Sequence, residues 1–464
     1  MSTTEMTTPA TPARGGRWID HWEPEDPEFW ETTGKRVARR NLWFSIFTEH
    51  IGFSIWVMWS VLVLFMGPKY GLSAADKFLL VSLPNLVGSL LRVPYTLAVA
   101  WFGGRNWTII SAALLLVPAI LAAVILQPGV SFGTLLVVAT LAGFGGGNFA
   151  SSMSNINTFY PDRLKGAALG LNAGGGNIGV AVVQLVGLLI IALAGTSAPR
   201  VLLGIYIPLI VIALLGAALF MNNITSVRND AGAAREALRN RDLWIMSFLY
   251  IGTFGSFIGY SFAFGLVLQN QFDRTPLQAA AVTFIGPLLG SLIRPLGGWL
   301  SDRIKGSIVT FWNFIAMVAA GILIILAANA ESLSLFTAGF IALFVLTGIG
   351  NGSTYKMIPS IFRAKADAAI AEGVARDEAL AHARRITGAT IGIVSAIGAL
   401  GGFFINLAFR QAFLTTGSGV LAFYSFIAFY AVCAIVTYAV YMRRRVDELG
   451  ADVPSPAHLA MQTV

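Results

Sequence analysis

Twelve long apolar segments follow one another along the chain, and they limit its fold more than any other feature. Each reaches the roughly 20 residues that an α-helix needs to cross about 30 Å of hydrocarbon. A membrane β-barrel would instead show segments of about 10 residues with alternating polarity. The sequence therefore predicts an all-α membrane protein with twelve transmembrane helices. The predicted segments are residues 42–66, 79–101, 107–126, 133–157, 166–190, 201–221, 243–268, 278–299, 308–328, 333–360, 388–412 and 418–441.

Composition excludes a water-soluble protein. Of 464 residues, 56% are hydrophobic and 12% are charged, whereas a soluble domain carries about 25% charged residues. The chain has one cysteine, Cys433, which cannot form an intrachain disulfide. The four histidines are scattered, and the sequence contains no nucleotide-binding loop, zinc motif or paired carboxylates. We therefore expect no enzyme activity, no metal and no cofactor.

Basic residues indicate the orientation. If the N-terminus lies inside, only five of the 31 lysine and arginine residues fall on the outer side. This bias follows the positive-inside rule and predicts that both termini are cytoplasmic. The net charge of +8 thus reflects topology, and we expect membrane lipid, not nucleic acid, as the partner. The five outer residues are Lys69, Lys77, Arg200, Arg274 and Arg410.

An internal repeat divides the twelve segments into two halves. Residues 88–92 in the second segment recur as residues 290–294 in the eighth, and 143–147 in the fourth parallel 348–352 in the tenth. Such a repeat is typical of transporters with two six-helix bundles around a central site. The polar stretch 363–386 is expected to be a solvated surface helix. The predicted divisions are a cytoplasmic tail at 1–41, bundles at 42–221 and 243–441, a cytoplasmic linker at 222–242 and a second cytoplasmic tail at 442–464.

Two arginines within the segments, Arg92 and Arg294, give the strongest functional signal. An unpaired guanidinium in hydrocarbon costs at least roughly 2.5–3.5 kcal/mol. Glu49 is the one acidic residue clearly inside a segment, so it cannot neutralise both arginines. An anionic substrate can, and the planar fork of arginine suits a planar oxyanion. The alternative is that each arginine reaches the interface or bonds backbone carbonyls.

Glycine and asparagine are frequent in the same segments. Glycines at four-residue spacing in the fifth and eleventh segments let another helix approach closely. They predict tight packing, a sliding interface between halves, or both. Asparagine offers donors without charge, and we expect Asn177 to face the substrate. The glycines are Gly166, Gly170, Gly174, Gly176, Gly179, Gly388, Gly392, Gly398, Gly401 and Gly402, and the other asparagines are Asn85, Asn148, Asn155, Asn172, Asn313 and Asn351.

Glu49, His50 and Lys356 are candidates for handling protons. By helical rise, Glu49 and Lys356 lie at similar depth, so an ion pair between them is one interpretation. Glu49 and His50 are neighbours and point about 100° apart on a helix, so we do not expect both to face the same cavity.

The chain resembles the nitrate/nitrite porters of NarK type within the major facilitator superfamily. The likeness covers most of the chain, and the glycine-rich stretches of the fifth and eleventh segments look like the two nitrate signatures of that family. The resemblance implies a multi-pass protein of the bacterial cytoplasmic membrane that carries nitrate and nitrite. The matching stretches are residues 22–30, 91–95, 147–153, 170–179, 243–247, 254–259, 297–303 and 395–404.

The same resemblance implies a substrate site. Arg92 and Arg294 would clamp the anion, and Asn177 and Tyr250 would donate hydrogen bonds. Two aromatic walls would lie above and below a flat ion, which would favour nitrate or nitrite over tetrahedral sulfate. These walls are Phe149 and Phe254.

Energy coupling stays open, because some members of the family lack the equivalents of Glu49 and His50 and have an uncharged residue at the position of Lys356. Two arginines without their anion would resist reorienting, which favours nitrate/nitrite exchange. Protonation of Glu49 on anion binding would instead permit nitrate/proton symport, which we favour slightly. The alternatives are a carrier for another small anion and a proton-coupled exporter of organic cations, although such an exporter would be expected to bury carboxylates.

Overall fold

The computed structural model describes residues 17–227 and 230–443, and it confirms an all-α protein. Twelve helices in this part of the chain are long and apolar enough to cross a membrane. Several begin or end well outside the predicted segments, because charged and polar turns continue the helices beyond the apolar core. The first span runs over Pro27–Phe65, although the sequence places its start at residue 42. The tail at 1–41 is therefore partly helical.

Within the described residues, the first half of the chain contains eight α-helices, a π-helical turn, a 3-10 turn and two short strands. Their bounds are β1 (Trp18–Ile19), α1 (Pro27–Phe29), η1 (Trp30–Gly34), α2 (Lys35–Phe65), η2 (Pro68–Tyr70), α3 (Ala74–Phe102), α4 (Gly104–Ile125), α5 (Phe132–Leu141), α6 (Phe144–Phe159), α7 (Asp162–Ala194), α8 (Pro199–Phe220) and β2 (Asn223–Ile224).

The remaining spans follow a short helix, α9 (Ala231–Arg239), in the predicted linker. Their bounds are α10 (Arg241–Tyr250), η3 (Ile251–Gly255), α11 (Ser256–Phe272), α12 (Pro276–Thr283), α13 (Ile285–Ile304), α14 (Gly306–Asn329), α15 (Leu333–Ala371), α16 (Arg376–Thr416), α17 (Val420–Thr437) and η4 (Tyr438–Arg443).

The prediction of a separate surface helix at 363–386 is wrong. Helix α15 continues to Ala371, the chain turns, and α16 begins at Arg376. Gly373 lies in this turn with φ of +100°, a backbone conformation that side chains with a Cβ rarely adopt. The stretch therefore forms the polar ends of two long spans joined by a tight turn.

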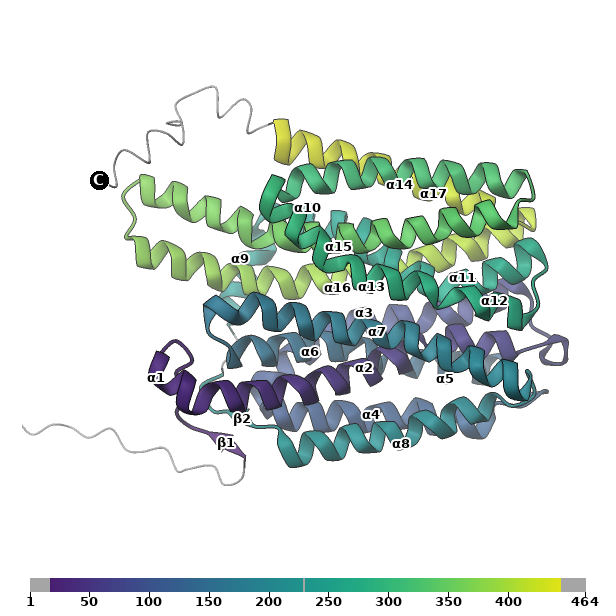
Figure 1. Ribbon diagram of the computed structural model, residues 1–464, viewed down its shortest axis with the longest axis horizontal. Coiled ribbons are helices and arrows are strands. Elements are labelled where there is room, and N and C mark those ends of the chain that lie inside the picture. The colour runs from purple at the N-terminus through teal and green to yellow at the C-terminus, as the bar shows by residue number, and fades with distance from the viewer. Residues whose placement is uncertain (1–16, 228–229, 444–464) are drawn as a thin grey trace, which may run out of the picture.

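The helices lie side by side in two groups, α2–α8 and α10–α17 (Figure 1). We call the end of the molecule with α1, α9 and the α15–α16 turn the tail end, and the other end the opposite end (Figure 1). Helix α3 contacts α16, and α7 contacts α13, so these helices join the groups. The domain boundaries in the sequence analysis stay a prediction.

The segment that precedes α2, residues 17–34, folds against the tail end of the first group. β1 pairs in parallel with β2, with Trp18 opposite Asn223. Trp30 is buried, and the ring of Trp22 meets that of Phe159 with centroids 5.3 Å apart. The aromatic residues of this acidic segment therefore anchor it to the protein, which the sequence analysis did not predict.

Close helix packing at glycines supports the predicted repeat. A Cβ placed on Gly146 of α6 would lie 2.6 Å from the Cα of Gly88 in α3, and one on Gly348 of α15 would collide with the carbonyl of Gly290 in α13. Both contacts need a residue without a side chain, because the backbones themselves touch. The two repeat motifs of each half thus pack on one another.

Three side-chain hydrogen bonds join the two groups within the described residues. Gln184 donates to the carbonyl of Ser261 over 2.8 Å near the opposite end, Arg92 bonds α16 at mid-depth, and Arg384 bonds α7 at the tail end. Aromatic stacking also joins the groups at the opposite end, where the ring centroids of Phe78 in α3 and Phe413 in α16 are 5.3 Å apart.

We expect Gly146→Ala to lower the thermal stability, because the added methyl has no space against α3. Overpacking of this kind costs about 1–3 kcal/mol. The matched control is Gly204→Ala in α8, where a Cβ would meet nothing within 4 Å. Thermal unfolding in detergent measures both, and equal midpoints for the two variants would contradict the close approach.

Candidate functional site

Arg92 of α3 lies at the centre of the molecule and is 0% exposed. Its Cζ is 4.7 Å from the ring centroid of Phe149 and 4.9 Å from that of Phe254. Its Nη1 donates to the backbone carbonyl of Ser395 over 3.0 Å. One ring comes from each helix group, so both groups position this guanidinium.

Arg294 of α13 is buried from the second group. Its Nη2 donates to the hydroxyl of Tyr250 over 3.3 Å, and its Cζ lies 5.5 Å from the ring centroid of Tyr355. Tyr250 in turn is held by Gly398 of α16, since a Cβ there would collide with the tyrosine ring. The repeat thus supplies one arginine from each half, both of them buried.

Each guanidinium keeps donors that no described residue accepts. These are Nε and Nη2 of Arg92 and Nη1 of Arg294. A buried donor without a partner costs about 1–3 kcal/mol, more when charged. The alternative that each arginine bonds backbone carbonyls therefore accounts for one contact of Arg92 and leaves the rest unexplained. The arrangement is suited to bind a small anion.

Glu49 of α2 is the carboxylate of this region and is 1% exposed. Its Oε2 accepts a 2.7 Å hydrogen bond from Nδ2 of Asn172, which also contacts Ser152. Its Oε1 has no partner among the described residues. Glu49 interacts electrostatically with both arginines, so all three charges belong to one site.

The other two candidates for proton handling, Lys356 and His50, contact groups other than the Glu49 carboxylate. Lys356 does not pair with Glu49: its Nζ lies 2.9 Å from Oδ1 of Asp302, and both side chains are about half exposed. That interpretation is therefore wrong, because Lys356 projects toward α13 at the rim. His50 places Nδ1 3.1 Å from the backbone carbonyl of Gly175 in α7.

The signature glycines fall into two classes. A Cβ would collide with Glu49 at Gly176, with the backbone of His50 at Gly179, with Gly255 at Gly401 and with Asn85 at Gly402. These positions pack tightly, as predicted. The prediction of tight packing is wrong for the glycines nearer the tail end, where a Cβ would meet nothing within 4 Å. They form one row along α7 and one along α16, which we call the glycine rows. These positions are Gly166, Gly170, Gly174, Gly388 and Gly392.

The remaining predicted site residues are two phenylalanines that contact each other and a buried asparagine. Phe149 and Phe254 stack on each other, with ring centroids 6.3 Å apart. Both rings contact the guanidinium of Arg92, whereas the resemblance implies that they lie above and below the anion. Asn177 of α7 is buried, and its Oδ1 has no partner among the described residues.

Sequence reasoning missed five contributors to the site, one of which is Trp56, whose ring centroid lies 5.5 Å from Cζ of Arg92. Asn172 was one of many buried asparagines without a distinguishing mark. The Ser395 contact uses a backbone carbonyl, which no sequence pattern reveals. Tyr355 and Ser152 are uncharged residues that no pattern in the sequence assigns to the site. Charge at depth was the usable signal, and these residues lack it.

We expect Gly176→Ala to displace the Glu49 carboxylate and to reduce both stability and affinity for nitrate, the anion that the resemblance implies. The physical reason is overlap between the new methyl and the carboxylate, at a cost of about 1–3 kcal/mol. Gly174→Ala, two residues away, meets open space and serves as the matched control. Thermal shift with and without nitrate checks both variants.

Comparison with known proteins identifies the family of this chain. Residues 42–375 match the model of the Major Facilitator Superfamily. The nitrate/nitrite transporter NarU of Escherichia coli strain K12 is 39% identical over 448 residues, with 92% of this chain and 96% of NarU covered. The probable nitrate/nitrite antiporter NarK2 of Thermus thermophilus is 33% identical over 468 residues, with 95% and 98% covered.

A solved structure shows the same fold. The D-xylose-proton symporter superposes with a TM-score of 0.64 at 14% identity, covering 86% of this chain and 96% of that protein. The chain therefore belongs to the Major Facilitator Superfamily, and within it to the family of NarU- and NarK-type nitrate/nitrite transporters.

Proposed function

We propose that this protein carries nitrate and nitrite across a bacterial cytoplasmic membrane by alternating access. The observation that supports it most is the pair of buried arginines, each with donors that no described residue accepts. Relatives that share 33–40% of their residues over nearly the whole chain are named as nitrate/nitrite transporters or antiporters.

The anion is bound by two forks from opposite sides of the molecule. Each guanidinium presents coplanar N–H groups, which match the paired oxygens of a planar oxyanion. Low local polarity strengthens these contacts, because three aromatic rings surround Arg92 and exclude water. The flat faces of Phe149 and Phe254 favour trigonal nitrate and bent nitrite over a tetrahedral anion.

Alternating access follows from the unequal ends. At the opposite end, stacked rings and the Gln184 contact hold the groups together. Toward the tail end, glycine rows of α7 and α16 border open space. Rocking of one group against the other would separate the groups at one end while it brings them together at the other. We assign the tail end to the cytoplasm, because basic residues concentrate there.

Coupling centres on Glu49. Its carboxylate offsets part of the positive charge of the two arginines, and a bound anion would add a second negative charge beside it. Uptake of a proton by the carboxylate removes this repulsion, so nitrate and a proton would travel together. Exchange of nitrate for nitrite needs no such step, because an anion then fills the site in both directions. The name of the Thermus relative favours exchange for that protein.

The test of function is uptake of labelled nitrate into proteoliposomes that contain the protein. We expect saturable uptake that unlabelled nitrite inhibits and sulfate does not. Arg92→Gln and Arg294→Gln each lose one charged donor group and are expected to weaken nitrate about 10- to 150-fold, since hydrogen bonds to charged groups contribute about 1.5–3 kcal/mol. Lys356→Gln, outside the site, is the control. Full uptake in both arginine variants would refute the proposal.

The test of coupling compares three driving forces: internal nitrite, an inward proton gradient, and neither. If Glu49 carries the proton, the gradient alone drives accumulation, and Glu49→Gln abolishes it while leaving nitrate/nitrite exchange intact. The glutamine keeps the shape and the hydrogen bond but cannot change its charge. Stimulation by internal nitrite alone would establish exchange and leave Glu49 a structural role.

A further inference from the structure

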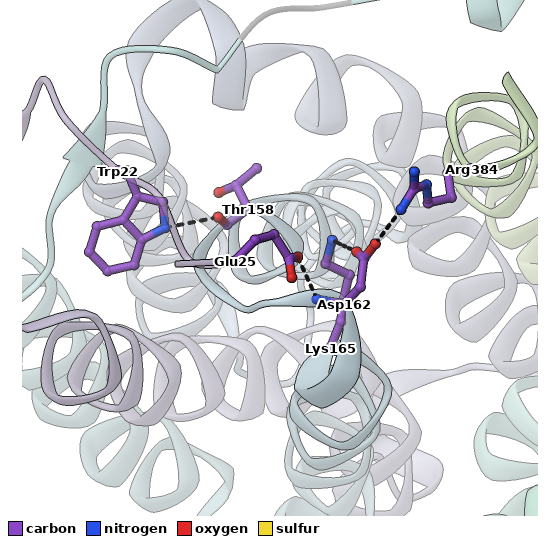
Figure 2. Close-up of polar contacts among 6 residues, drawn as sticks. All are labelled: Trp22, Glu25, Thr158, Asp162, Lys165 and Arg384. Atoms are coloured by element: carbon purple, nitrogen blue, oxygen red, sulfur yellow. Dashed lines mark hydrogen bonds and ion pairs between the residues drawn. The ribbon is translucent and has the colours of Figure 1, made fainter. Parts of the chain in front are cut away.

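Asp162, the first residue of α7, is the meeting point of three segments (Figure 2). Its Oδ2 lies 2.7 Å from Nη1 of Arg384 in α16, so the contact joins the two helix groups. Its Oδ1 lies 2.7 Å from Nζ of Lys165, one turn along the same helix. Lys165 thus fixes one carboxylate oxygen and leaves the other directed at Arg384.

The position of this pair relates it to the glycine rows. Asp162 precedes Gly166 by four residues on α7, and Arg384 precedes Gly388 by four on α16, which continues the spacing of each row. The ion pair therefore lies at the tail-end terminus of both rows, where open space borders the glycines. Any separation of α7 from α16 at this end must break the pair.

The N-terminal segment holds Asp162 in place. The carboxylate of Glu25 accepts a 2.7 Å hydrogen bond from the backbone N–H of Asp162 (Figure 2). Pro161, the N-cap residue of α7, provides no side-chain cap, so Glu25 supplies the anionic group that a helix N-terminus favours. Nε1 of Trp22 donates to the carbonyl of Thr158 over 3.1 Å and fixes the preceding turn.

We propose that Asp162 and Arg384 form a clasp that restrains opening at the tail end, and that residues 22–25 set its strength by fixing the start of α7. The proposal rests on transport by alternating access and identifies the clasp residues as positioning residues that do not touch the anion. A cytoplasmic segment that is released from α7 would then loosen the clasp and change the rate at which the transporter reorients.

The size of the effect follows from exposure. Asp162 and Arg384 are 42% and 64% exposed. Ion pairs of this kind shift a two-state equilibrium by about 1.5- to 5-fold. Such a shift changes the balance between inward and outward states without abolishing either, which suits a regulatory contact. Screening by salt weakens it further.

The experiment measures the distance across the tail end in the full-length protein in lipid nanodiscs. Spin labels are attached at Ala167→Cys of α7 and Ala381→Cys of α16 in a Cys433→Ala background. Pulsed electron paramagnetic resonance then measures the distance between the two labels. Both labelled positions are exposed, and neither belongs to the clasp. No substrate is present, so the result does not depend on whether the protein carries nitrate.

We expect Asp162→Asn, Arg384→Gln and Glu25→Ala each to increase the widely separated population about 1.5- to 5-fold, and Arg384→Lys to stay near the original distribution. High salt is expected to increase the widely separated population of the original protein as well, and to have little effect on the distances in Asp162→Asn. The controls are Arg363→Gln, which breaks an ion pair of similar exposure within α15, and Glu23→Ala, which removes a carboxylate of the same segment that lies 3.8 Å from His21.

Two results would overturn the proposal. Unchanged distances in folded Asp162→Asn and Arg384→Gln, together with no salt response of the original protein, would eliminate the clasp. Equal distances in Glu25→Ala and Glu23→Ala would eliminate the role of the N-terminal segment. If the aspartate variant does not fold, Arg384→Gln, Arg384→Lys and the salt series still decide the question.

Discussion

Burial of two guanidinium groups with a single carboxylate nearby is the constraint on which the rest of the structure depends. Hydrocarbon cannot solvate Arg92 and Arg294, so the protein must surround them with aromatic rings, a tyrosine hydroxyl and a backbone carbonyl. Those contacts come from both helix groups. The charge of the site therefore links anion binding to the relative placement of the two halves, because moving one half against the other changes the partners of Arg92, which come from both groups.

Glycine provides the geometry that this arrangement needs. Helices α3 and α6 approach until their backbones touch, and the same contact recurs between α13 and α15. Gly176 and Gly398 remove side chains where Glu49 and Tyr250 must fit. The same residue type leaves open space along the tail-end parts of α7 and α16. Glycine thus gives rigidity inside each group and freedom between the groups, depending on what faces each position.

The three hydrogen bonds between the groups occur at three depths and have different strengths. The central bond involves Arg92, which we propose binds the substrate, so a bound anion would compete with the Ser395 carbonyl for its donors. The bond near the opposite end is buried and uncharged, whereas the tail-end bond is an exposed ion pair. An exposed ion pair is the easiest of the three to modulate, because salt and neighbouring chain segments reach it. Regulation at the tail end therefore need not disturb the site.

The sequence by itself determined the twelve spans, the repeat and the two buried arginines, because apolar length and charge at depth cost enough free energy to be visible in a single sequence. It did not determine where the helices end. The composition of 363–386 predicts a surface helix, because polar helix ends and separate helices have the same composition, but these residues form the ends of α15 and α16. The sequence also did not determine the partner of Lys356. Lys356 pairs with Asp302 and not with Glu49, and this depends on which helix faces point toward one another. The tertiary structure alone decided the Ser395 contact, the two classes of glycine and the Asp162–Arg384 pair, since each joins segments that are far apart in the chain and follows from packing between groups.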